Sequence, residues 1–193
     1  MSYSRRAIMK VLLATNGALA AASSAAHGQG SSEFTAITRG SDRLLNLLET
    51  QPYVSEGNGK PLFIIMSQSC PYCLALRMEQ PRPPQGVEFR WLPGPYSGGN
   101  NDQMVEVRIR RDVPTFNAYM TRQLSAPPLT SRSGGIDIYN QSVVSLKEIV
   151  SIIAQNNGVR GTPAMIWLKN GTVYQSMGYT KEIFNRVVRH MKA

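Results

Sequence analysis

Apolar and polar positions change their spacing along the chain, and each change marks a predicted element. Residues 61–69, PLFIIMSQS, open with an unbroken apolar run, which is typical of a buried strand. Residues 87–95, VEFRWLPGP, alternate between apolar and polar positions and predict a second strand. A helical pattern lies between them and stops at QPRPPQG, because proline cannot continue a helix.

The second half of the chain has its clearest signals from Ser142 onward, where apolar residues recur at helical spacing until NNG. Residues 164–169, AMIWLK, and 172–179, TVYQSMGY, predict two strands. Asn170 and Gly171 join them and form a strong two-residue hairpin signal. The last segment predicts a closing amphipathic helix with one apolar face, made of Ile183, Phe184, Val187, Val188 and Met191.

The remaining stretches are less regular. Residues 29–40 are expected to be a flexible lead-in, followed by a short helix that Ser41 can cap and by a loop at residues 55–60. Between residues 96 and 135, MVEVRIRR fits either a strand or the end of an amphipathic helix. PTFNAYMTRQL predicts a helix, and APPLTSRSGG predicts a loop.

Together, these elements predict an α/β protein, a thioredoxin fold with an inserted helical subdomain. A parallel strand pair with a crossover helix, followed by an antiparallel hairpin, gives a sheet with helices on both faces. We expect the thioredoxin-like domain to span residues 61–193, with the helical insert at about 96–157. Residues 29–60 are expected to form an N-terminal lead-in that holds one short helix and no clear strands.

The first 28 residues have the pattern of a secretory signal peptide. A basic start with Arg5, Arg6 and Lys10 precedes an apolar segment at about 11–22, which ends in small residues. The segment is interrupted by polar residues and is shorter than the roughly 20 apolar residues that a membrane-spanning helix needs. SRRAIMK also resembles the twin-arginine export motif. We expect a cleaved, periplasmic protein, with the choice between the twin-arginine and the general export route left open.

Charge adds little to this interpretation. The chain has 21 Lys and Arg against 12 Asp and Glu, and without residues 1–28 its net charge falls from +9 to +6. The densest basic stretch, VRIRRD at 107–112, has neither interleaved aromatic residues nor a nucleic-acid-binding motif, so we expect no nucleic-acid partner. The roughly 165 residues left after cleavage are enough for one domain with a substantial core.

Cys70 and Cys73 are the two cysteines of the chain. A passive disulfide at this spacing closes too small a loop to constrain the unfolded chain much. Zinc takes four ligands, or three and a water, and His190 is the single histidine outside residues 1–28, so we expect no metal and no cofactor. A redox-active pair is the favoured interpretation of C-P-Y-C.

The position of the pair after a strand supplies the chemistry. If Cys70 ends the strand, Pro71 occupies the first helical position, where its missing N–H costs nothing. The free N–H groups of the first turn and the helix dipole then favour the thiolate of Cys70, the form that attacks disulfides. Cys73 is expected to be more buried, less ionised and the resolving thiol, while Pro71 and Tyr72 set the redox potential.

A second candidate element, Thr162-Pro163, comes just before the strand predicted at 164–169. The trans form is the commoner one for a bond before proline. Together with C-P-Y-C after a strand, however, the pattern favours a cis bond that exposes the backbone of Thr162 beside Cys70. An extended peptide could then add as a strand at that edge.

These motifs resemble the catalytic domain of the DsbC/DsbG family of periplasmic protein disulfide isomerases and reductases. The resemblance covers residues 61–193 and rests on SCPYC, VEFRWL, the insert, GVRGTPAMIWLKNGTV and the final helix. It implies Cys70 as nucleophile, Cys73 as resolving thiol, and Thr162 and Pro163 as a substrate-binding cis-proline loop. We expect Pro71 and Tyr72 to bind the substrate as well. The resemblance also implies cysteine-containing protein substrates and a membrane redox partner that resets the pair.

The chain departs from that family in one respect, because about 30 residues between signal and first predicted strand replace the usual dimerisation domain. Three functions therefore stay open: a reductase or isomerase of the DsbC/DsbG type, a monomeric disulfide oxidase, and a thioredoxin-fold assembly factor for a secretion or conjugation apparatus. Whether the protein is a monomer or a dimer also stays open.

Overall fold

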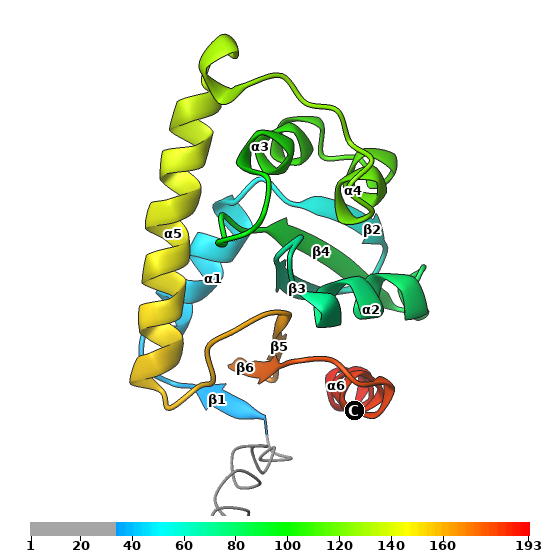
Figure 1. Cartoon of the computed structure of the whole chain (residues 1–193). Coiled ribbons are helices and arrows are strands. Elements are labelled where there is room, and N and C mark those ends of the chain that lie inside the picture. Colours follow the sequence, from blue (N-terminus) through cyan, green and yellow to red (C-terminus); the bar gives the residue numbers. More distant parts are fainter. Residues whose placement is uncertain (1–33) are drawn as a thin grey trace, which may run out of the picture. The chain divides into compact units, whose positions relative to one another are not determined.

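A six-stranded sheet with the order β1-β6-β5-β3-β4-β2 forms the centre of the computed structural model, which describes residues 34–193 (Figure 1). The signal peptide predicted at residues 1–28 lies outside the described residues. The strands are β1 (Thr35–Ile37), β2 (Val54–Gly57), β3 (Lys60–Met66), β4 (Val87–Pro93), β5 (Ala164–Lys169) and β6 (Thr172–Met177).

The central four strands have the topology of a thioredoxin fold. Strands β3 and β4 are parallel and are connected by α2 (Pro71–Glu79), while β5 pairs antiparallel with both β3 and β6. Helix α6 (Lys181–Lys192) closes the chain. Asn170 and Gly171 have φ angles of 48° and 78°, as a tight hairpin turn requires. The predicted fold and hairpin are therefore confirmed.

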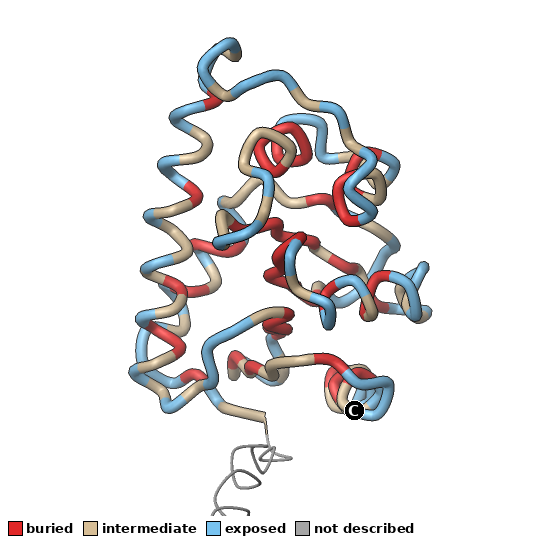
Figure 2. The backbone as a smooth tube through the Cα atoms, in the orientation of Figure 1, coloured by how far each residue is buried: buried red, intermediate tan, exposed pale blue. Residues whose placement is uncertain are grey.

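Helices cover both faces of the sheet. Figure 1 shows α2 and α6 on one side of the strands, and α1 (Ser41–Thr50) and α5 (Gly135–Gln155) on the other. Leu62 and Ile64 of β3 belong to the buried cluster under α2 and α6, whereas Phe63 belongs to the cluster under α1 and α5. Strand β3 is thus buried on both faces, which explains its unbroken apolar run. In Figure 2 the buried residues follow the strands and the inward sides of the helices.

The segment between β4 and β5 forms α3 (Asn101–Arg110), α4 (Val113–Met120), the short 3-10 helix η1 (Leu129–Ser131) and α5. The helical alternative for MVEVRIRR is therefore right. Helix α5 starts at Gly135, earlier than the apolar spacing after Ser142 indicated. Its first turn begins at the end of the SGG stretch of the predicted loop, and Ile138 and Tyr139 pack against the cluster that contains the buried residues of α3 and α4. The insert expected at about 96–157 thus has two parts, a subdomain around α3 and α4 and the crossover helix α5.

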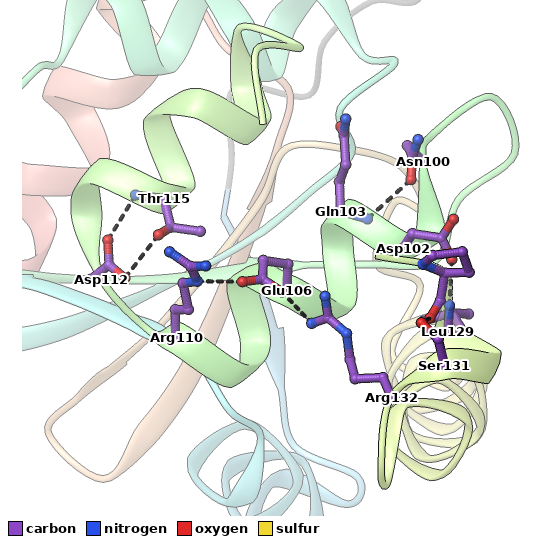
Figure 3. Close-up of polar contacts among 11 residues, drawn as sticks. Asn100, Asp102, Gln103, Glu106, Arg110, Asp112, Thr115, Leu129, Ser131 and Arg132 are labelled. Carbon is purple, nitrogen blue, oxygen red and sulfur yellow. Dashed lines mark hydrogen bonds and ion pairs between the residues drawn. The ribbon is translucent and has the colours of Figure 1, made fainter. Parts of the chain in front are cut away.

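Polar contacts hold the subdomain around α3 and α4 together (Figure 3). The side chain of Asn100 caps α3 by accepting from the N–H of Gln103 at 3.0 Å, and Asp112 caps α4 in the same way. The carboxylate of Glu106 pairs with both Arg110 and Arg132. Because Arg132 belongs to the loop after α4, its ion pair with Glu106 connects that loop to α3.

Residues 34–60 contain two strands of the sheet, which corrects the expectation of a lead-in without strands. Strand β1 pairs with β6, and β2 pairs with β4. These edge strands span three and four residues, too few for an alternating pattern to identify them. The predicted short helix is confirmed as α1, although Gly40 rather than Ser41 occupies its N-cap position. Within residues 34–193, no helix combines the length and the apolar character needed to cross a membrane.

Candidate active site

Cys70 lies between β3 and α2, at the N-cap position of the helix. Its φ and ψ angles of −87° and 117° are extended, and Pro71 is the first helical residue, as predicted. The carbonyl of Cys70 accepts from the N–H groups of Cys73 at 3.1 Å and Leu74 at 3.2 Å. Cys70 is partly exposed, whereas Cys73 is fully buried, and both are free thiols in this structure.

The environments of the two thiols push their pKa values apart. Burial by itself raises the pKa of Cys70, but hydrogen bonds with the side chains of Thr162 and Cys73 and with the N–H groups of Cys73 and Tyr72 bring the pKa below its ordinary value. Burial first, and then the neighbouring Cys70, raise the pKa of Cys73 to about 12. At neutral pH, Cys70 is the more readily ionised sulfur, in agreement with the sequence-based expectation.

Thr162 and Pro163 lie beside Cys70, and the peptide bond between them is cis, as predicted. The register of the sheet explains the position, because Ala164 of β5 pairs with Ile65 near the end of β3. The thiol of Cys70 donates to the carbonyl oxygen of Thr162 at 3.1 Å. This contact favours the protonated thiol, whereas the hydrogen bond with the Thr162 side chain favours the thiolate.

A groove of about 460 Å³ opens beside Cys70, bounded on one side by α2 and on the other by the end of α4. Leu74 and Met78 line the α2 side, and their side chains are 38% and 67% exposed. Met120 and Arg122 line the opposite side. The groove is therefore largely apolar with one cationic end.

Apart from Cys70 and Pro71, sequence reasoning missed the residues of this groove, although a signal for two of them exists. Leu74 and Met78 follow Cys70 by four and eight positions, which places all three on one face of the helix. Tyr72, a predicted substrate-binding residue, is 59% exposed and is not among the residues that line the groove. Pro71 lines it directly beside Cys70.

Tyr96 is a further neighbour of the pair that the sequence did not indicate. Burial, and then negative charge on Cys73 and Cys70, raise the pKa of Tyr96, so its phenol stays protonated at neutral pH. Among residues 34–193, no group of three or more His, Cys, Asp and Glu side chains is placed to hold a metal ion.

Comparison with known proteins finds similarity among solved structures, whereas no protein-family model and no curated protein matches the chain. The thiol-disulfide exchange protein alpha-DsbA2 from Wolbachia pipientis is 14% identical, with a TM-score of 0.45 over 77% of this chain and 91% of that chain. A variant of DsbA from Pseudomonas aeruginosa is 18% identical, with a TM-score of 0.32 over 66% of this chain and 84% of that chain. Both TM-scores are below 0.5, so neither structure assigns functional residues to this chain. The candidate site follows from the geometry of this chain.

The fold and the site define the class of protein. It is a thioredoxin-fold protein with a C-x-x-C pair at the start of α2, a cis-proline segment beside the exposed sulfur, and a helical insert over one side of the site.

Proposed function

We propose that the chain is an exported thiol–disulfide oxidoreductase that exchanges disulfides with cysteine-containing proteins through Cys70 and Cys73. The observation that carries this proposal is the asymmetry of the pair. Cys70 is partly exposed with a lowered pKa, and Cys73 is buried with its pKa raised to about 12. A nucleophile that reacts first and a protected thiol that reacts second need this difference.

In the reducing direction, the thiolate of Cys70 attacks one sulfur of a substrate disulfide. A bond forms between Cys70 and that sulfur, the substrate S–S bond breaks, and the other substrate sulfur leaves as a thiolate. Cys73 then loses its proton and attacks the sulfur of Cys70, which releases the second substrate thiol. The substrate gains two electrons, and the chain ends as a Cys70–Cys73 disulfide. Oxidation of a substrate dithiol is the reverse of these steps.

The substrate would lie along the exposed edge next to Cys70. An extended segment can reach the backbone of Thr162 and pass over Pro163, while Pro71 and the exposed ring of Tyr72 contact it near the reacting sulfur. The apolar groove between α2 and α4 offers space of about 460 Å³ for a side chain of the substrate close to its cysteine.

For the direction of transfer, we propose a reductase or isomerase of the DsbC/DsbG type, supported by the GVRGTPA stretch that precedes β5. A disulfide oxidase is the second candidate, and the lowered pKa of Cys70 favours it, because stabilising the thiolate stabilises the reduced pair and makes its disulfide more oxidising. In both cases, a membrane redox partner resets the pair in the periplasm. An assembly factor that only binds peptides would have no use for the asymmetric thiols.

Two serine variants test the order of attack. Cys70→Ser should abolish thiol exchange, whereas Cys73→Ser should accumulate mixed disulfides with substrate proteins in the exporting cell. Normal turnover by either variant would contradict the proposal. Trapping the thiols of the wild-type protein in the cell decides the direction. A mostly reduced pair supports the reductase or isomerase, and a mostly oxidised pair supports the oxidase.

A further inference from the structure

Gln68, two residues before Cys70, is a buried amide whose hydrogen bonds all reach the insert. Its side chain is 8% exposed. The NH2 group donates to the side-chain oxygen of Gln103 and to the carbonyl of Tyr119, both at 2.7 Å. Its carbonyl oxygen accepts from the N–H of Asn100 at 3.1 Å. One side chain of the active-site loop thus joins the start of α3 to the end of α4.

The partners of Gln68 are themselves fixed. Figure 3 shows Asn100 and Gln103 together at the start of α3, where Asn100 caps the helix. Gln103 also donates to the carbonyl of Leu124, beyond the end of α4. A buried amide with every donor and acceptor engaged holds its surroundings in one arrangement, because losing a partner leaves a polar group unsatisfied.

Other contacts also hold the loop that carries Cys70, among them a 2.9 Å hydrogen bond between the hydroxyls of Ser67 and Ser69. Within it, the N–H of Cys70 donates to the carbonyl of Ser67 at 3.2 Å. Outside it, the hydroxyl of Ser69 donates to the carbonyl of Ser97 at 3.0 Å. Gln68 also lines the groove beside Cys70. The placement of the sulfur over the first N–H groups of α2 therefore depends on how residues 67–69 are held.

We propose that Gln68 is a positioning residue for Cys70, which fastens the C-P-Y-C loop to the helical insert and so makes the reactivity of the sulfur depend on the insert. This inference rests on the proposed function, because a positioned sulfur matters only if it reacts. It differs from a purely structural role, in which Gln68 would stabilise the insert and leave the sulfur unchanged.

The test uses Gln68→Met, which keeps the size of the side chain and removes all three hydrogen bonds. Gln103→Met removes one of these three bonds from the side of α3, together with the bond to Leu124, and leaves residues 67–70 intact. Gln141→Met, at an exposed position of α5, is the matched control. The readouts are the pH profile of thiolate absorbance and the rate of Cys70 alkylation by iodoacetamide, neither of which needs a disulfide substrate.

Gln68→Met should raise the apparent pKa of Cys70, and alkylation at pH 7 should slow by about tenfold or more, as misplaced reacting groups commonly show. Gln103→Met should change both readouts in the same direction but by less, because two bonds of Gln68 remain. The double variant should add little to Gln68→Met, since that change already removes the bond with Gln103. The control should match the wild type.

A folded Gln68→Met protein with wild-type pKa and alkylation rate would overturn the inference. If Gln68→Met does not fold, Gln103→Met is the test. A wild-type pKa and a wild-type alkylation rate of Cys70 in that variant would also overturn the inference. Failure of the proposed function gives a different result, because wild-type Cys70 would then show no enhanced alkylation and no exchange with any disulfide.

Discussion

The sulfur of Cys70 lies 3.1 Å from the carbonyl oxygen of Thr162, a residue 92 positions later in the chain. The antiparallel register between β3 and β5 creates this contact. Ile65 near the end of β3 pairs with Ala164 at the start of β5, so the segments that hold Cys70 and Thr162 meet at this edge of the sheet. In the proposed function, a disulfide that reaches Cys70 would therefore also meet Thr162. Thr162 can influence both the ionisation of the sulfur and the path of the substrate.

Replacing Thr162 by Val removes the hydroxyl and keeps the branched shape. Because the hydrogen bond with this side chain lowers the pKa of Cys70, the variant should have a higher pKa. Alkylation at pH 7 should slow by about 2- to 10-fold, the range for one hydrogen bond. The difference should vanish at high pH, where Cys70 is ionised in both the variant and the wild type. Iodoacetamide rates between pH 5 and 10 measure this. Thr162→Ser keeps the hydroxyl and serves as control, and superimposable profiles for Thr162→Val and wild type would refute the assignment.

Met78→Gln tests whether the groove beside Cys70 binds the substrate. The side chain is 67% exposed, so the free energy of unfolding should not change. Exchange with a protein substrate should lose about 1 kcal/mol of apolar contact, which is about fivefold in kcat/KM. Exchange with glutathione disulfide should stay at the wild-type rate, because it is too small to need the groove.

Val144→Gln is the matched control for the groove, since Val144 is 64% exposed and belongs to α5 on the other face of the sheet. It should leave both reactions unchanged. Equal losses in the two variants would mean that an added polar side chain anywhere on the surface slows exchange, and that the groove does not bind the substrate.

The ion pair between Glu56 and Arg77 connects β2 to α2 at 2.7 Å, with both side chains largely buried. Glu56 also accepts from the indole N–H of Trp91 at 3.0 Å. Glu56→Gln should lower the free energy of unfolding by about 3 kcal/mol, because it leaves a buried guanidinium without its counter-charge. Glu56→Gln combined with Arg77→Met should be more stable than Glu56→Gln alone.

Urea unfolding of these variants measures the effect. The exposed pair between Arg43 and Glu148 provides the comparison, and Glu148→Gln should leave the unfolding midpoint unchanged. A wild-type midpoint for Glu56→Gln would show that the buried pair contributes nothing.

His190 should make stability depend on pH in the weakly acidic range. Its Nδ1 atom accepts from the indole N–H of Trp167 at 3.1 Å, among the rings of Phe34 and Tyr174. Burial, and then the charge of Lys169, lower the pKa of His190 from 6.5. The unfolded chain therefore binds the proton first, so stability is full above pH 6.5 and is lost as the pH falls toward the folded-state pKa.

His190→Gln keeps an acceptor for Trp167 and does not titrate, so its urea midpoint should change less than that of the wild type between pH 7.5 and about 5. Burial raises the pKa of Glu88, but contacts with Arg90 and Ser55 lower it below its ordinary value of 4.5. The stability that Glu88 contributes is therefore lost only below about pH 4.5, outside this window. Identical pH dependence in both proteins would remove His190 as the source.

Most of the thioredoxin core could be predicted because its signals are local. The unbroken run in β3, the hairpin residues Asn170 and Gly171, and the one-sided apolar pattern of α6 each lie within a few residues. Strands β1 and β2 were missed because each is an edge strand of three or four residues, whose pairing depends on β6 and β4. The first turns of α5 were missed because Ile138 and Tyr139 pack against the subdomain around α3 and α4, which lies far from them in the sequence.

The order of residues along this chain was enough to determine the chemistry of the candidate site. A cysteine that follows a buried strand and precedes a proline indicates that a helix begins at the proline, which places the cysteine sulfur at the N-terminus of that helix. Only the tertiary structure decided what does surround it: Thr162 at the sulfur, Met120 and Arg122 across the groove, and Gln68 bound to the insert. Those contacts join residues far apart in the chain, and their positions depend on strand register and helix packing, which no local pattern encodes.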